Sequence, residues 1–350
     1  MTLEQVGVGT PPLTYVVPLR RWHTPADGEL GGYLRWLAIE VGLQVIVVDG
    51  STPELFAAHR RAWPAEVIHV PVDVDLHGRY GKVNGVVTGL RAAGNERVVI
   101  ADDDVRWDRA GLDRMAALLG HADLVCPQNH FDPLPWHARW DSARSLFNRA
   151  TGIDLPGTLG VRRSVVLDAG GYDGDALFEN LELIRTVQAV EGRACSAPDL
   201  FVRRLPPSTH HFWSQRVRQA YDDLALPIRV AAELALLPLA VTLVYRRQGR
   251  ALALGALAAI SAAEVGRQRA NGASVFPPAC SLFAPLWLGE RALCIWVALW
   301  IRVTRGGVSY AGTVLTKTAN SPRQLRLRLR APRDTPGCRG RSPYRRTRAS

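Results

Sequence analysis

The sequence predicts an α/β fold, a mostly parallel sheet with helices on both faces, followed by hydrophobic helices. Up to about residue 205, short apolar runs alternate with longer amphipathic stretches. Strands separated by helices of this length form parallel β-α-β units with a doubly covered sheet. From about residue 224 the composition changes to long apolar segments. The chain has 350 residues, which is enough for a sizeable core.

The individual elements follow from the spacing of apolar residues. We expect strands at 13–19, 44–50, 66–72 and 97–104, and helices at 31–42, 82–94 and 111–120. The strand "QVIVVDG" ends in Asp49 and Gly50, and the strand "RVVIADDD" ends in three aspartates. In parallel sheets, ligands bind outside the carboxyl ends of the strands. Two acidic strand ends therefore predict a binding site at this edge.

The charge and cysteine content exclude several classes of protein. The net charge is +11, but ten arginines and one aspartate lie between Arg323 and Ser350, so most of the charge belongs to a tail. No nucleic-acid motif accompanies it, and we do not expect nucleic-acid binding. The five cysteines contain no CxxC pair, which argues against a disulfide framework or a zinc site. The N-terminal residues lack the pattern of a signal peptide.

Three apolar segments follow, at 224–245, 251–263 and 281–303. The first and third approach the roughly 20 residues of a membrane span, and the second is short. The tryptophans of the third segment favour a membrane interface. Charges within the first and third leave a buried helical subdomain as the alternative; they are Arg229, Glu233, Glu290 and Arg291.

The aspartate run offers ligands for a hard cation. If the chain stays extended, Asp102 and Asp104 point to one face and Asp103 to the other. Mg²⁺ and Mn²⁺ prefer oxygen ligands and share them with substrate phosphates. The alternative is a loop of solvated acids or helix caps. Asp49 could accept hydrogen bonds from a base or ribose, or be a turn residue. Lys82 could meet a phosphate or a carboxylate, or be a surface lysine.

Several segments together carry a resemblance. "GKVNGVVTGLRAAGNERVVIADDDVRW", "VIVVDGS", "GTLGVRRSVVLDAGGYD" and "QRVRQ" resemble, in order and spacing, motifs of family-2-type glycosyltransferases, especially the ceramide glucosyltransferase-like branch. The resemblance covers roughly residues 12 to 225. It implies a GT-A fold and inverting transfer from a nucleotide-diphosphate sugar. In this sequence Asp103 stands where serine is usual, and Gln219 stands where tryptophan is usual.

The resemblance also implies roles for particular residues. Asp102 and Asp104 would hold Mn²⁺ or Mg²⁺. The donor would be bound by a second set: Asp49, Lys82, Asp103, Gln215 and Arg218. Arg216 could join Arg218 at the diphosphate, and His210 or His211 could complete a metal shell or be interfacial.

The residue that should act as the base is missing. The family uses the aspartate of an E-D pair, and here Glu179 is followed by Asn180. An amide cannot take a proton from the acceptor. Either Glu179 or Glu182 replaces it, or the protein is slow or inactive. The alternative is that these acids simply begin a helix.

The sequence therefore predicts a membrane-associated, metal-dependent inverting glycosyltransferase with a lipid acceptor. We expect a GT-A domain at 1–225, membrane-associated helices at 226–305 and a basic, disordered tail at 306–350. The domain and tail would face the cytosol at the cell membrane, with the second and third apolar segments crossing and the first interfacial. Crossing by the first and second segments and a wholly monotopic arrangement are the alternatives. Alternatives are transfer to a polyprenyl phosphate, a non-catalytic protein that binds a sugar nucleotide, and a nucleotidyltransferase.

Overall fold

The structure is a computed structural model that describes residues 12–22, 29–152, 154–310 and 313–330. The strands are β1 (Leu13–Leu19), β2 (Gln44–Asp49), β3 (Ile68–Val70), β4 (Arg97–Ile100), β5 (Val105–Arg106), β6 (Leu124–Phe131), β7 (Leu159–Arg162), β8 (Ala194–Arg204), β9 (Val308–Tyr310) and β10 (Thr313–Leu315). The helices of the sheet domain are α1 (Glu29–Arg35), continued by the π-turn η1 (Trp36–Glu40), α2 (Pro53–Ala62), α3 (Gly81–Ala92), α4 (Arg109–Leu118), α5 (Trp136–Thr151), α6 (Arg163–Asp168), α7 (Glu179–Ala189) and α8 (Thr209–Asp223).

The later helices are α9 (Pro227–Tyr245), α10 (Gly249–Gln268), the short 3₁₀ segment η2 (Arg269–Ser274), α11 (Ala279–Leu282), α12 (Ala284–Arg305) and α13 (Pro322–Arg330). The predicted strands and helices of the first part are present, with boundaries shifted by a few residues. The largest difference is at β4, which ends at Ile100, so that a turn carries the aspartate run.

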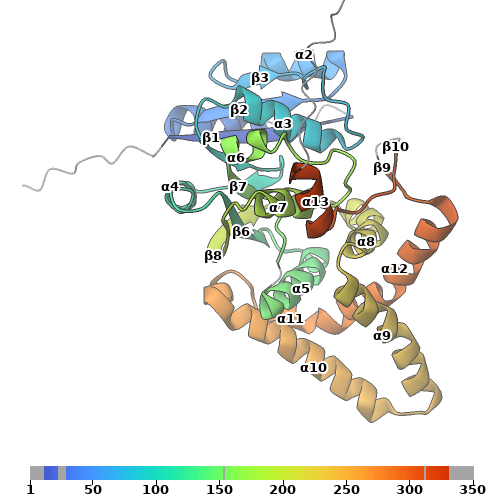
Figure 1. Cartoon of the computed structure of the whole chain (residues 1–350). Coiled ribbons are helices and arrows are strands. Elements are labelled where there is room, and N and C mark those ends of the chain that lie inside the picture. Colours follow the sequence, from blue (N-terminus) through green and yellow to red (C-terminus); the bar gives the residue numbers. More distant parts are fainter. Residues whose placement is uncertain (1–11, 23–28, 153, 311–312, 331–350) are drawn as a thin grey trace, which may run out of the picture.

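The sheet has eight strands in the order β3-β2-β1-β4-β7-β6-β8-β5. β7 is antiparallel to both neighbours, β4 and β6, and the edge strand β5 is antiparallel to β8. The remaining pairs are parallel. Parallel strands are covered on both faces, which explains their continuous apolar sequences. The predicted α/β fold class is confirmed: a mostly parallel sheet carries helices on both faces, and hydrophobic helices follow (Figure 1).

The core is divided between the two faces of the sheet. Side chains of β1 alternate, so that Tyr15 and Val17 join one cluster with α1 and α4, and Val16 joins the other with α3. Gly89 on α3 lies directly over Val16, and a β-carbon there would collide with the valine. Close packing of α3 on β1 fixes the start of α3, which carries Lys82, against the end of the sheet.

The hydrophobic helices gather around α5 and α8. α10 packs on α5 through Ala259, Ala263 and Gly266, and Gly266 meets the Leu146 carbonyl where no side chain would fit. α12 packs against α5, α8 and α9. α9 and α10 form a V whose turn points away from the sheet domain (Figure 1). By length and composition, the described residues contain three helices that can cross a membrane, namely α9, the stretch from Gly249 to Ser274, and α12.

The chain then returns to the sheet domain. Leu177 and Phe178 donate backbone hydrogen bonds to the carbonyls of Lys317 and Thr318, and α13 packs against α7 (Figure 1). The expectation of a disordered tail from residue 306 is therefore wrong for 313–330. Apolar contacts such as the buried Leu325 hold this stretch, although its composition is basic. Residues 331–350 of the expected tail lie outside the described residues.

Candidate active site

A cavity of about 790 Å³ opens at the carboxyl ends of β1, β4 and β8. Its walls combine the end of β1, the start of α3, the aspartate run, the start of α7 and one face of α8. The cavity also reaches Arg229 on α9 and Arg291 on α12. Ligands of parallel sheets bind at this edge, as the sequence predicted. One pocket therefore joins the acidic strand end to the hydrophobic helices.

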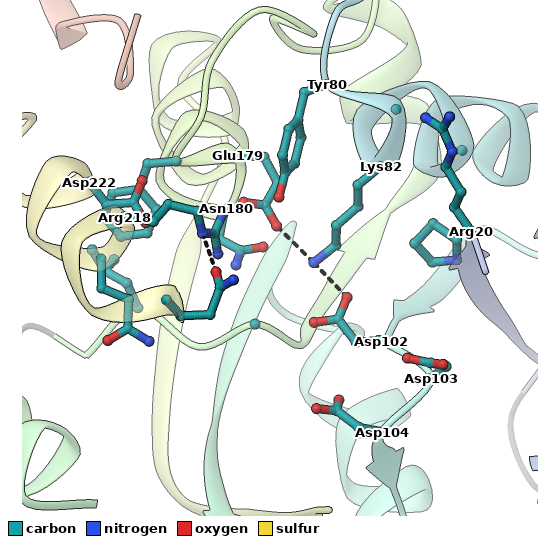
Figure 2. A pocket seen from close by; sticks show the side chains of 18 of the residues that line it. Arg20, Tyr80, Lys82, Asp102, Asp103, Asp104, Glu179, Asn180, Arg218 and Asp222 are labelled. Carbon is teal, nitrogen blue, oxygen red and sulfur yellow. Dashed lines mark hydrogen bonds and ion pairs between the residues drawn. The ribbon is translucent and has the colours of Figure 1, made fainter. Parts of the chain in front are cut away.

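Lys82 connects two acids of this pocket (Figure 2). Its Nζ lies 2.6 Å from Asp102 Oδ1 and 2.7 Å from Glu179 Oε1. Burial lowers the pKa of Lys82, but the two carboxylates outweigh burial and hold this pKa well above its ordinary value. The lysine is therefore charged, and it contacts carboxylates, which was one of the two partners expected for it.

Arginines neutralise the rest of the aspartate run. Arg204, the last residue of β8, lies 2.9 Å from Asp104 and 3.4 Å from Asp102, and Arg21 lies 2.9 Å from Asp103. Burial raises the pKa of Asp102, but Lys82 and Arg204 outweigh it and the net shift is downward. For Asp104, burial together with the neighbouring aspartates outweighs Arg204, and its pKa is raised. Asp104 therefore lacks full compensation.

The carboxylates of the aspartate run are suitable ligands for a divalent cation, but two of them are paired with Arg204. All three carboxylates line the cavity and offer the oxygen ligands that Mn²⁺ and Mg²⁺ prefer. Asp102 and Asp104 both contact Arg204, although a turn carries them and not the extended strand on which a common face was expected. An ion held by these two would supply the positive charge that Asp104 lacks, with Arg204 giving up part of its contact.

Asp49 lies in a different environment from the one expected. Its side chain is fully buried, and its Oδ2 lies 2.7 Å from His59 Nδ1 and 3.1 Å from His69 Nε2. Trp63 stacks on His59 and Phe56 on His69. Burial raises the pKa of Asp49, but hydrogen bonds from Ser51 and the two histidines outweigh it and lower the pKa.

Asp49 is not among the residues that line the cavity, although its neighbours Val48 and Gly50 are. Asp49, His59 and His69 each offer one ligand atom, and among the described residues these three atoms lie close enough together to bind one metal ion. The hydrogen bonds already account for the burial of this carboxylate. Contact between Asp49 and a nucleoside stays a prediction that this arrangement does not favour.

The two candidate bases have different surroundings. Glu179, at the start of α7, lines the cavity and is ion-paired with Lys82. Glu182, one turn later, does not line the cavity. Its Oε2 and Oε1 accept hydrogen bonds from the backbone and side chain of Asn320, each 2.7 Å long. The proposal that Glu182 takes the proton is therefore at odds with its position, because it holds the returning C-terminal segment instead.

α8 presents two of the expected residues to the cavity. Gln215 and Arg218 both line it, and Arg218 Nε donates a 2.6 Å hydrogen bond to Gln215 Oε1. Arg216 lies on the opposite face, where it pairs with Asp141 and Glu290, so it is not available to a diphosphate. His211 lines the cavity, whereas His210 does not.

Sequence reasoning missed other residues that line the cavity: Arg20, Arg144, Arg204, Asp222, Asp223, Arg229 and Arg291. Asp222 carried a signal, because it follows Arg218 by four residues and therefore lies on the same face of a helix. Arg204 ends a strand but follows another arginine, Arg203, and no pattern in the sequence distinguishes the two. Arg291 was noted only as an unfavourable charge in an apolar segment.

No protein-family model and no curated protein sequence matches this chain. Among solved structures, the chain is similar to the mannosyltransferase PcManGT from Pyrobaculum calidifontis, in complex with GDP-Man and Mn²⁺. The identity is 22%, the match covers 82% of this chain and 87% of that one, and the TM-score is 0.47.

Two further similarities are weaker. Glucosyl-3-phosphoglycerate synthase from Mycobacterium tuberculosis, in complex with Mn²⁺, UDP and phosphoglyceric acid, is 14% identical over 58% of this chain and 73% of that one, with a TM-score of 0.38. S. aureus TarS 1-349 in complex with UDP-GlcNAc is 15% identical over 58% of this chain and 61% of that one, with a TM-score of 0.40.

Proposed function

We propose that this protein is a membrane-associated glycosyltransferase that moves a sugar, with inversion, from a nucleotide-diphosphate sugar to a lipid or lipid-linked acceptor. One observation carries the proposal. A single cavity is lined by the carboxylates and cations of the sheet edge and also by Arg229 and Arg291, which belong to helices with exposed apolar side chains. A charged donor and an amphipathic acceptor need these two environments side by side.

The residues of the cavity divide the work as follows. Asp102 and Asp104 hold a divalent cation, which supplies charge neutralisation for the diphosphate leaving group. Lys82 keeps Asp102 and Glu179 in place through its two ion pairs. Arg218, oriented by Gln215, meets the diphosphate or the acceptor end with a guanidinium suited to phosphate oxygens. Asp103, which lines the cavity and is paired with Arg21, contacts the donor in this proposal.

The hydrophobic helices provide the membrane surface in this proposal. Large apolar side chains are exposed on α9, α10 and α12, among them Leu239, Leu257, Trp300 and Val303. Soluble monomers rarely expose large apolar patches. In contrast, Glu290 of α12 faces inward, where Trp140 donates a 2.8 Å hydrogen bond to it.

We propose that α9 to α12 lie in one leaflet without crossing it. α12 packs along α5 and α8 of the sheet domain, which leaves no room for it to pass through a bilayer. The turn between α9 and α10 carries Arg246 and Arg247, and Arg250 follows at the start of α10; all three would have to be moved across the membrane. The sequence favoured membrane crossing by the second and third apolar segments, α10 and α12. We propose the arrangement in one leaflet instead, because α12 packs against the sheet domain.

A donor and acceptor panel tests the proposed function. The purified full chain is incubated with UDP-, GDP- and dTDP-sugars, with Mn²⁺ or Mg²⁺, and with lipid extract in detergent micelles. We expect nucleotide release and a labelled lipid with one donor. Nucleotide binding without any turnover would support the non-catalytic alternative. No binding of any nucleotide would refute both.

Cysteine labelling tests the membrane arrangement. With Gln248→Cys at the turn of the V, we expect an impermeant reagent to label the protein only from the face on which the sheet domain lies. Labelling only from the opposite face would refute the arrangement in one leaflet and support crossing by α9 and α10. Ser321→Cys, which lies beside α13 on the sheet domain, is the matched control for the sheet-domain face.

A further inference from the structure

The proposed function leaves one chemical step without a residue. Transfer to a hydroxyl requires a group that takes its proton, and Asn180 cannot do so because an amide has no basic atom. Glu179 is ion-paired with Lys82 at 2.7 Å, so its carboxylate already has a partner in the cavity. Glu182 is outside the cavity and bonded to Asn320. The base has to come from another element.

Asp222 meets the requirement. It lies in the last turn of α8, next to Arg218, and lines the cavity that Asn180 also lines, away from the aspartate run (Figure 2). Its Oδ1 is buried and has no hydrogen-bond partner among the described residues. A buried carboxylate oxygen without a partner is costly, and it is satisfied once a donor, such as an acceptor hydroxyl, enters the cavity.

We propose that Asp222 is the general base of the transfer, in the place of the missing aspartate at 180. This inference rests on the proposed function. In the step, the acceptor oxygen forms a bond to the anomeric carbon of the donor sugar. The bond from that carbon to the diphosphate oxygen breaks, and its electron pair leaves with the nucleoside diphosphate. The hydroxyl proton passes to Asp222 Oδ1, and the resulting carboxylic acid returns it to solvent.

The surroundings of Asp222 set its pKa in a range that suits a general base. Burial raises its pKa to about 7, with Glu179 and Asp223 adding to the rise and Arg218 and Arg291 opposing it. These groups come from α7, α8 and α12, the elements that face the carboxylate. A base works best with a pKa near the operating pH. Because Asp222 acts in its ionised form, the rate rises as the pH rises through about 7 and is level above it.

The assignment also narrows the class of acceptor. A hydroxyl group must lose its proton during attack, whereas a phosphate monoester already carries a charged oxygen and needs no base. A base in the cavity therefore points to an alcohol acceptor, such as a diacylglycerol or the hydroxyl of a lipid-linked sugar. This argues against the polyprenyl-phosphate alternative.

Asp222→Asn is the decisive variant. The full chain in micelles is supplied with the donor that the wild type uses, with Mn²⁺, and with either dioleoylglycerol or farnesyl phosphate. We expect wild-type transfer to dioleoylglycerol, and a loss of roughly 10²–10⁴-fold in Asp222→Asn. Nucleotide affinity and the thermal midpoint should stay close to wild type. Asp113→Asn, a partly exposed aspartate on α4 that does not line the cavity, is the matched control and should be fully active.

The outcomes distinguish a failure of the Asp222 assignment from a failure of the proposed function. An active wild type with an equally active Asp222→Asn variant overturns the inference alone, as does transfer to farnesyl phosphate only. If the variant fails to fold, the wild-type pH profile decides: a rate that does not change between about pH 5.5 and 8 overturns the inference. A wild type that releases no nucleotide from any donor overturns the proposed function, and the inference with it.

Discussion

Replacing Lys82 by methionine tests whether the pocket is held together by this one cation. The side chain is 18% exposed and lies within 2.7 Å of both Asp102 and Glu179. Methionine fills a similar volume without charge, so the two acids are left facing one another. Removing one partner from a buried ion pair costs about 3–5 kcal/mol.

The cost appears as a lower thermal midpoint. For a domain of about 200 residues, 1 kcal/mol corresponds to a shift of about 2–4 °C, so Lys82→Met should unfold about 6–20 °C below wild type. The measurement is thermal unfolding of the full chain in detergent micelles, followed by circular dichroism. Transfer activity should be lost as well, because Asp102 and Glu179 lose their fixed positions.

The other lysine of the chain provides a matched control. Lys317 is also ion-paired at 2.7 Å, with Asp173, but it is 42% exposed, and Arg328 and Asn320 contact the same carboxylate. Exposed pairs of this kind contribute about 0–1 kcal/mol, so Lys317→Met should shift the midpoint by a few degrees at most. Equal shifts in the two variants, or less than about 3 °C for Lys82→Met, would refute the reasoning.

Three further substitutions separate structural from chemical roles. Asp104→Asn should reduce Mn²⁺-dependent transfer by at least about 100-fold with little change in the thermal midpoint. Full activity of this variant, or full activity of the wild type in EDTA, would contradict the metal role. Glu182→Gln should lose about 1–3 kcal/mol of stability, measured as a lower thermal midpoint, because the NH₂ group of the new amide faces a hydrogen-bond donor of Asn320. The transfer rate per folded molecule should be unchanged. A loss of rate without a loss of stability would identify Glu182 as the base. Asp49→Asn should also lose about 1–3 kcal/mol of stability, because the Asp49 carboxylate is paired with two histidines. Its nucleotide affinity, measured by calorimetry, should be unchanged, since the side chain does not line the cavity. A tenfold weaker affinity in a stable variant would favour contact between Asp49 and the nucleoside.

The sequence determined the fold class and the place of the site. The strands are buried on both faces, and this produces apolar runs that local patterns reveal. The aspartates of 102–104 follow one of these runs, and in a parallel sheet the end of a strand is where ligands bind. These are properties of neighbouring residues in the chain, so no knowledge of distant contacts was needed to predict them.

Only the tertiary structure decided the partners of each charge. Arg204 reaches Asp104 across 100 residues, and Asn320 reaches Glu182 across 138. No periodicity encodes such contacts, because the pairing depends on how the helices and strands pack. The same packing turned Glu182 and Asp49 away from the cavity and brought Asp222 into it. It also buried the charges of α12, which the sequence showed only as interruptions of an apolar segment, against the sheet domain.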